Sequence, residues 1–346
     1  TTVCPESRPG KPLSPMKIIT DIRHKLYSDT LNLNQHDGAL VGGLISETEL
    51  WSCTTCGACM EECPVLIEHV PTITDMRRHL VLSEGKPPEQ SNESLEKTLQ
   101  NGNPWGMPQH ERLKWADDFD LDLPTLADKK EVDVLYWVGC AGSYDPRNQG
   151  IARDLVKILQ NAGIDFAVLG KEETCTGDSA RRLGEEYLFE TLANQNIETL
   201  NKYKFDTVIT ACPHCFQVIS KEYKDFGGDY NVIHHSEYIQ KLIDEEKIKV
   251  SPNIDGTITY HDACYLGRYN DIYEAPRTII ESLLNNGKIV EMKDNKSGSL
   301  CCGAGGGNMW HEITDGDRIN IKRFEQAIDT QADTVATACS FCAIMM

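Results

Sequence analysis

Short apolar runs and helical patterns alternate along residues 131–250. The runs at 132–138, 166–169 and 207–211 have the length of buried strands, and a further strand is expected to end at His234-His235. Between them, 147–161 and 183–200 carry apolar residues at helical spacing. Strands that alternate with helices predict a parallel sheet covered by helices, so this segment is expected to form an α/β domain.

The same plan recurs over residues 251–346. Strands are predicted at 257–261, near 288–292 and at 334–338, with helices at 276–285 and at about 317–330. Segments 206–212 and 333–339 share the pattern Asp-Thr-Val-x-Thr-Ala-Cys. Self-similarity at a fixed period indicates a duplicated unit. We therefore expect two copies of one α/β domain, at 131–250 and 251–346, with the second cut short at its C-terminus.

Residues 1–82 carry amphipathic helical patterns. One lies at 17–27, another at 70–82, and the first places four apolar residues on one stripe, Ile18, Ile19, Ile22 and Leu26. These segments are expected to be packing helices of an all-α module. The predicted fold class is therefore a multi-domain α+β protein, in which this module precedes the two α/β copies.

Residues 83–130 are interpreted as a connector. Stretches rich in Gly, Pro and Asn at 83–88 and 101–106 are typical of breaks in regular structure. Trp105 and Trp115 are expected to pin this segment to a neighbouring surface, and packing is favoured over cofactor binding for both rings.

Charge narrows the range of partners. The 346 residues carry a formal net charge of −19, whereas nucleic-acid binding needs clustered Lys and Arg, so no nucleic-acid partner is expected. The acidic surface fits solubility, or docking of a basic partner. The sequence has no apolar run long enough for a membrane-spanning helix.

Fourteen cysteines dominate the candidate chemistry. Several of them form C-x2-C pairs, a spacing that favours chelation over long-range disulfides in a chain of this size. Cys53, Cys56, Cys59 and Cys63 form C-x2-C-x2-C-x3-C-P, the bacterial ferredoxin run for a [4Fe–4S] cluster. A zinc site usually uses two separated pairs of ligands instead.

Cys4-Pro5 resembles the end of a second such run. We therefore expect the chain to begin inside a two-cluster module. In ferredoxins the fourth Cys of one run ligates the other cluster. That pattern groups Cys4 with Cys53, Cys56 and Cys59 in one cluster. It assigns Cys63 to a second cluster, whose other three ligands would lie upstream. The alternative keeps Cys63 with the other three and leaves Cys4 free.

The remaining cysteines repeat with the two α/β copies. Cys212 and Cys215 recur at Cys339 and Cys342, each 127 residues further along (212→339, 215→342). The first copy supplies Cys140, Cys175, Cys212 and Cys215, and the second supplies Cys264, Cys301, Cys302, Cys339 and Cys342. The same offset matches Cys175 with Cys302 and Thr174 with Cys301. Since each set follows strand ends, its loops are expected to converge on one site per copy.

The second set is the stronger candidate for redox chemistry, because five thiolates exceed what zinc or a cubane cluster requires. Gly303, Gly305 and Gly306 are expected to let backbone N–H groups approach a cofactor there, since the dinucleotide fingerprint is incomplete. Met309, Trp310 and His311 are expected to begin the following helix. His214 and His261 are candidate hydrogen-bond donors to the metal ligands or proton carriers, or plain structural residues.

The duplicated motif resembles the cysteine-rich CCG domain of heterodisulfide reductases and related iron–sulfur subunits. The motifs are most similar to those of membrane-linked electron-transfer-flavoprotein:menaquinone oxidoreductases, at 10–15 (GKPLSP), 103–106 (NPWG), 137–143 (WVGCAGS), 175–178 (CTGD), 211–216 (ACPHCF), 261–268 (HDACYLGR) and 301–307 (CCGAGGG). The resemblance implies [4Fe–4S] clusters, with a noncubane cluster on the five cysteines of the second copy. Haem b is implied only for a membrane domain ahead of residue 1.

The resemblance also implies a function. Electrons would enter from reduced electron-transfer flavoprotein or another flavoprotein dehydrogenase, pass through the clusters, and reach haem and menaquinone. The chain would be cytoplasmic and held at the inner face of the membrane by the preceding domain. The alternatives are a disulfide reductase subunit, or the iron–sulfur subunit of a glycolate, lactate or glycerol-3-phosphate dehydrogenase complex. A zinc-stabilised scaffold without redox chemistry is a third possibility.

Overall fold

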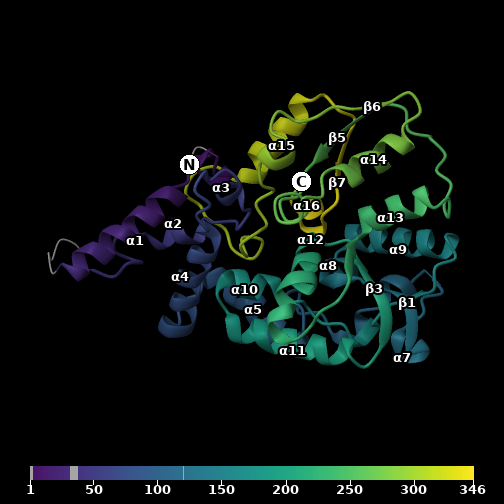
Figure 1. Ribbon diagram of the computed structural model, residues 1–346, viewed down its shortest axis with the longest axis horizontal. Coiled ribbons are helices and arrows are strands. Elements are labelled where there is room, and N and C mark those ends of the chain that lie inside the picture. Colours follow the sequence, from purple (N-terminus) through teal and green to yellow (C-terminus); the bar gives the residue numbers. More distant parts are fainter. Residues whose placement is uncertain (1–2, 32–37, 120) are drawn as a thin grey trace.

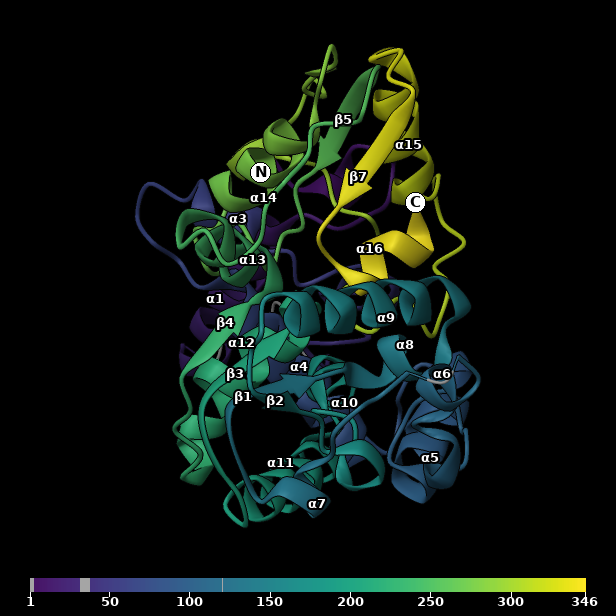
Figure 2. The same ribbon diagram turned by 90° about the vertical axis from the view of Figure 1, so that its right-hand side faces the viewer.

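The computed structural model describes residues 3–31, 38–119 and 121–346. Helices from the N-terminal part lie at one end of the molecule, and two separate parallel sheets make up the rest (Figure 1). Seen from the side, the second sheet stands above the first, with helix α9 between them (Figure 2). The mixed fold with two parallel-sheet domains confirms the expectation from the alternating patterns.

The first sheet has the strand order β2-β1-β3-β4, and all its neighbours are parallel. Its strands are β1 (Glu131–Trp137), β2 (Phe166–Ala167), β3 (Lys204–Thr210) and β4 (Val232–His234). The helices of this copy are α8 (Gly139–Tyr144), α9 (Pro146–Asn161), α10 (Asp178–Leu183), α11 (Glu186–Leu200), α12 (Pro213–Gln217) and α13 (His235–Asp244). The predicted strand ending at His234 is confirmed.

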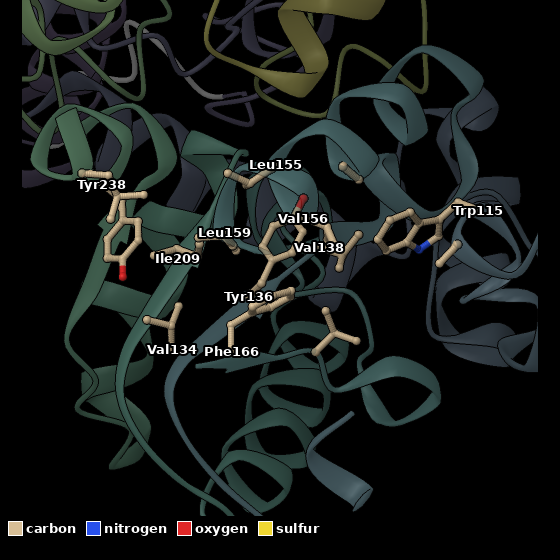
Figure 3. Close-up of a cluster of buried hydrophobic side chains, with 14 residues drawn as sticks. Trp115, Val134, Tyr136, Val138, Leu155, Val156, Leu159, Phe166, Ile209 and Tyr238 are labelled. Carbon is tan, nitrogen blue, oxygen red and sulfur yellow. The ribbon is translucent and has the colours of Figure 1, made fainter. Parts of the chain in front are cut away.

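Strand β1 is buried on both faces. Val134 and Tyr136 pack with Leu155 and Leu159 of α9, and Trp115 closes one end of this cluster (Figure 3). Residues on the opposite face of the strand pack against α11 in a second cluster. A strand covered on both sides needs apolar residues at successive positions, which explains the continuous apolar run at 134–138, after the exposed Asp133.

The second sheet has the order β6-β5-β7 and is also parallel. Its strands are β5 (Thr257–His261), β6 (Lys288–Ile289) and β7 (Thr334–Thr337). Three helices belong to this copy, α14 (Glu274–Leu283), α15 (Ile319–Asp329) and α16 (Ser340–Met345). The segment at Met309–His311 forms turns, so the prediction that it begins a helix is wrong. Its flanking glycines, Gly306, Gly307 and Gly316, all adopt positive φ, which disfavours a helix there.

The N-terminal part is helical. Its helices are α1 (Pro15–Thr30), α2 (Glu47–Trp51), α3 (Ala58–Glu61) and α4 (His69–Glu84). Helix α1 starts where the Ser14 side chain accepts a hydrogen bond from the Lys17 N–H. Helices at 17–27 and 70–82 are confirmed, but the predicted stripe is not, because Ile18 is fully buried and Leu26 is 65% exposed. No helix in the described ranges is both long and apolar enough to cross a bilayer.

The connector contains regular structure that the sequence did not predict. Helix α5 spans Glu89–Asn101, and the short helices α6 (Lys114–Asp117) and α7 (Leu126–Lys129) follow. The buried residues of α5 are Ser91, Ser94 and Thr98, and Leu95 packs partly buried beside them, so the helix shows no continuous apolar stripe. The predicted breaks are present, because α4 and α5 end at Gly85 and Gly102 in left-handed conformation. Trp115 is buried in the core of the first copy, and Trp105 packs edge-on against Trp310.

The predicted helix at 183–200 is confirmed as α11, which begins at Glu186 because a turn at Gly184 separates it from α10. This glycine has φ +89°, and a Cβ there would lie 2.6 Å from the carbonyl carbon of Arg77. The close approach of α4 to this turn therefore requires glycine.

Candidate metal centres

The cysteines of the first copy line one cavity at the carboxyl edge of its sheet. Cys140 follows β1, Cys175 lies in the loop beyond β2, and Cys212 and Cys215 follow β3. All four cysteines are among the residues that line this cavity. Side-chain contacts join Cys140 to Cys175 and Cys212 to Cys215. The three loops thus converge as the strand pattern predicts.

A buried ion pair lies against this first set of cysteines. The Arg112 guanidinium is 3.7 Å from Cys140 Sγ and forms a salt bridge with Glu173 at 2.5 Å. The Glu173 carboxylate also accepts hydrogen bonds from the N–H groups of Val138 and Gly139. Burial lowers the pKa of Arg112, but the charge of Glu173 outweighs it and raises this pKa, so a permanent cation faces the sulfur. Nothing in the sequence spacing indicated this pair.

The second copy gathers five cysteines. Cys302 Sγ and Cys342 Sγ are 3.3 Å apart, and both lie within 4.8 Å of a ring nitrogen of His261. Cys264 contacts Cys301, and Cys339 contacts Cys342. The structure therefore brings the whole predicted set together and adds His261 to it.

Matching hydrogen bonds define how the two copies correspond. The Gly177 N–H donates to Cys175 Sγ at 3.4 Å, and the Gly303 N–H donates to Cys301 Sγ at 3.2 Å. The two glycines have φ of +88° and +90°. Cys175 contacts Cys140, just as Cys301 contacts Cys264. Cys175 is therefore the structural equivalent of Cys301.

The residue that replaces a cysteine in the first copy is consequently Thr176. Its hydroxyl lies 3.9 Å from Cys215 Sγ, as the Cys302 thiol lies against Cys342. The predicted match of Thr174 with Cys301 is wrong. Thr174 donates its hydroxyl hydrogen to Asn196 instead, at 2.8 Å. A constant offset of 127 residues fails here because the segment between the loop cysteine and the C-x2-C pair is one residue longer in the second copy than in the first.

Four cysteines meet in the N-terminal part. Burial and the neighbouring thiols of Cys56 and Cys53 raise the pKa of Cys4 to about 12. Burial and the thiols of Cys53, Cys56 and Cys4 likewise raise the pKa of Cys59. Cys63 lies apart, partly exposed, and its Sγ accepts a hydrogen bond from the Ile67 N–H at 3.3 Å. The grouping follows the swapped pattern, in which Cys4 replaces Cys63.

This N-terminal set adjoins the second copy directly. The thiol of Cys56 contacts that of Cys301, so sulfur contacts run without interruption from one module into the other. A Cβ on Gly305 or Gly306 would lie 2.2 Å from the carbonyl oxygen of Thr54 or Cys53, respectively. These two glycines therefore let the loop approach the Cys53–Thr54 backbone. Of the three predicted glycines, Gly303 directs its N–H at a cysteine sulfur.

Arg77 of α4 holds this junction. It is fully buried and donates hydrogen bonds to five carbonyl oxygens, those of Leu50, Trp51, Cys53, Arg182 and Gly306. The guanidinium fork thereby ties the helical part to both α/β copies. Nothing in the amphipathic pattern of α4 distinguished this arginine from an exposed one.

Aromatic rings connect the first site with the other two. His214, between Cys212 and Cys215, stacks on Tyr265 at 4.0 Å, and Tyr265 stacks on Tyr269 at 4.6 Å. The hydroxyls of both tyrosines hydrogen-bond Thr55, between Cys53 and Cys56. Burial disfavours the imidazolium of His214, but hydrogen-bonded Asp178 outweighs it and raises the pKa of His214 to about 9.

The three sets of donors fit iron–sulfur clusters. Soft thiolate ligands suit iron–sulfur and zinc centres, and backbone N–H groups already point at sulfur in each set. Buried thiolates placed side by side repel one another, so thiols in such a set lose their protons only when metal cations balance the charge. All fourteen thiols are free of disulfides.

Comparison with known proteins agrees with this geometry. The family model of the CCG cysteine-rich domain matches twice, at residues 134–220 and 258–346. The chain is 37% identical to a Bacillus subtilis protein named "Probable iron-sulfur-binding oxidoreductase FadF", with all of this chain and 55% of the relative covered. It is 39% identical to "EtfAB:quinone oxidoreductase" of Syntrophomonas wolfei, covering 91% of this chain and 45% of the relative.

A third relative has a different named activity. The chain is 33% identical to a subunit of the dihydromethanophenazine:CoB--CoM heterodisulfide reductase of Methanosarcina barkeri, over 85% of this chain and 71% of the relative. The chain spans about half the length of the two relatives above. Since the CCG domain occurs twice and the relatives are iron–sulfur oxidoreductases, the chain belongs to the CCG-domain family of iron–sulfur oxidoreductases.

Proposed function

We propose that the chain is the electron-relay part of a flavoprotein:quinone oxidoreductase. The observation that carries this proposal is the unbroken line of sulfur contacts from the N-terminal set, through Cys56 and Cys301, into the second copy. Cofactors that exchange electrons one at a time must lie close together in a relay, and this contact brings two sites together. Iron–sulfur clusters supply one-electron transfer when bound.

The donor sets favour different clusters. The N-terminal set, Cys4, Cys53, Cys56 and Cys59, would hold a ferredoxin-type [4Fe–4S] cluster, and Cys63 would serve a second cluster with ligands upstream. The first copy offers four thiolates, which suit a cubane. The second copy offers five, Cys264, Cys301, Cys302, Cys339 and Cys342, which suit a noncubane [4Fe–4S] cluster.

The first copy joins the relay through the aromatic stack. His214 contacts both Tyr265 and Phe341, and Phe341 lies between Cys339 and Cys342 of the second copy. Tyr265 in turn hydrogen-bonds Thr55 at 2.9 Å. One junction therefore joins the loops that carry all three sets of cysteines.

The donor in this proposal is reduced electron-transfer flavoprotein or a related flavoprotein dehydrogenase. The name of the Syntrophomonas relative supports it, since that protein is an EtfAB:quinone oxidoreductase. Menaquinone would be reached through haem b in a preceding membrane domain, which would hold the chain at the inner face of the membrane. The net charge of −19 favours a partner with a basic docking face.

A second candidate is disulfide reduction at the second copy. It is favoured by the five-thiolate set and by the similarity to the heterodisulfide reductase subunit. A site that cleaves a disulfide must admit the substrate to the cluster. Cys301, Cys302, Cys339 and Cys342 are all buried, and Cys264 is only partly exposed, so the geometry favours relay over substrate access.

Anaerobic mixing experiments separate these functions. The reconstituted chain would be mixed with photoreduced electron-transfer flavoprotein, and flavin reoxidation would be followed together with bleaching of the cluster absorbance. We expect stoichiometric transfer with this donor and no thiol release from an added disulfide. Release of two thiols from the added disulfide for every two electrons taken from the flavoprotein, or from a chemically reduced chain, would favour the reductase. A matched Cys56→Ser variant should retain iron in the first copy but transfer fewer electrons.

A further inference from the structure

The first strand of each α/β copy ends in a ring that carries an N–H group. Trp137 ends β1 three residues before Cys140, and His261 ends β5 three residues before Cys264. Trp137 pairs with Thr210 of the neighbouring parallel strand, and His261 pairs with Thr337 in the same register. The two rings therefore occupy the same position in the two copies.

In the second copy an arginine fixes which nitrogen of His261 carries the proton. The Arg323 Nε–H donates to His261 Nδ1 at 2.8 Å, and Arg323 is fully buried. Arginine is a donor only, so Nδ1 accepts and the ring proton lies on Nε2. That nitrogen remains for the hydrogen bond that joins His261 to the Cys302 side chain.

In the first copy the indole N–H of Trp137 has no hydrogen-bond acceptor among the described residues. Trp137 is fully buried and is one of the residues that line the cavity of the four cysteines. The Nε1 atom itself is buried. A buried N–H without a partner is destabilising, so this donor is available to an acceptor bound in the cavity.

We propose that His261 Nε2–H and Trp137 Nε1–H are equivalent hydrogen-bond donors to the sulfur of the bound cluster in their own copy, and that they raise its reduction potential. Reduction adds negative charge to the sulfurs, so a fixed N–H donor stabilises the reduced form more than the oxidised one. Arg323 acts as a positioning residue, because it holds His261 in the donating tautomer. This inference rests on the proposed cluster binding at the two sites.

Redox titration of the reconstituted chain, followed by electron paramagnetic resonance, tests the proposal. His261→Phe should lower the potential of the second site alone, and Trp137→Phe that of the first site alone. A tenfold shift of each one-electron equilibrium corresponds to about 59 mV. His261→Gln keeps an N–H donor and should restore part of the potential, whereas Arg323→Lys, which frees the tautomer, should lower it in part.

Pulsed resonance with nitrogen-15 histidine provides a second readout. A weak coupling at the second site that disappears in His261→Phe supports the donor role, and a strong coupling typical of a direct iron ligand overturns it. Unchanged potentials in both ring variants, with iron content retained, also overturn the inference while leaving the relay function intact. Absence of iron from the unaltered chain would contradict the proposed function instead. If His261→Phe loses iron, the potentials of His261→Gln and Arg323→Lys are compared with that of the unaltered chain instead, and no shift in either variant overturns the inference.

Discussion

Thr176 of the first copy occupies the position that Cys302 occupies in the second. The Thr176 hydroxyl lies 3.9 Å from Cys215 Sγ, and the Cys302 thiol lies 3.3 Å from Cys342 Sγ. A single hydroxyl-for-thiol difference thus separates a four-thiolate site from a five-thiolate site within the same local backbone.

The substitution Thr176→Cys should give the first copy the ligand set of the second. We expect its resonance spectrum to move toward that of the second site, because a fifth soft ligand changes the cluster that is stable there. The control is Thr174→Cys. The Thr174 side chain bonds Asn196 rather than a cysteine, so this control should leave the spectrum unchanged. A response to Thr174→Cys and none to Thr176→Cys would show that the correspondence of the copies is wrong.

Arg77→Ala should destabilise the protein strongly. The change leaves five buried carbonyl oxygens without their donor, so we expect a loss of roughly 4 kcal/mol in the free energy of unfolding. Arg78→Ala is the matched control. Arg78 forms partly exposed ion pairs with Asp75 and Glu186, worth less than about 1 kcal/mol. Equal losses in the two variants, measured by anaerobic urea unfolding, would exclude the proposed role of Arg77 at the junction.

Gly306→Ala should move the loop that carries Gly305 and Gly306 away from the N-terminal set of cysteines. The new Cβ would lie 2.2 Å from the Cys53 carbonyl oxygen, and Gly306 has φ +67°. We expect a loss of about 3 kcal/mol or more and a lower iron content in the N-terminal set. Gly298→Ala serves as control, since no atom lies within 4 Å of its Cβ position. Normal stability and iron content in Gly306→Ala would show that close packing at this loop is dispensable.

Acid should destabilise the fold in part through His311. Burial, with a smaller contribution from the charge of Arg77, lowers the pKa of His311 to about 4 from 6.5. Between these values the unfolded chain binds a proton that the native state does not, so the free energy of unfolding falls as pH falls. From pH 7 to 5 this contribution is about 2 kcal/mol.

His311→Gln removes this titration and should lose less stability over that interval than the unaltered protein. Urea unfolding at the two pH values, followed by tryptophan fluorescence under anaerobic conditions, measures the difference. Equal losses in both proteins would mean that His311 binds its proton between pH 7 and 5 in the native state as it does in the unfolded chain.

The sequence predicted the features that depend on local pattern. The run 132–138 and its partner strands are recognisable because burial on both faces requires consecutive apolar residues. The convergence of Cys140, Cys175 and Cys212 followed from strand direction alone, since parallel strands end at the same edge of a sheet.

Features that depend on distant partners were not predictable. Arg77 and Arg112 look like any charged residues in the sequence, and their carbonyl, carboxylate and thiol partners are brought to them only by folding. Helix α5 was missed because it buries hydroxyl side chains. The match between Thr176 and Cys302 was missed because one residue of difference between the copies shifts the loop, although 175–177 and 301–303 share the pattern Cys-x-Gly. The glycine N–H to sulfur bonds and the matching thiol contacts reveal the shift.

The iron and sulfide content of the anaerobically reconstituted chain, measured with its resonance spectrum before and after reduction, tests the central claim most directly. We predict several irons per chain with matching sulfide, and reducible [4Fe–4S] signals from the sets that include Cys56, Cys140 and Cys301. A chain that retains zinc, contains no iron and gives no signal on reduction would contradict the relay function.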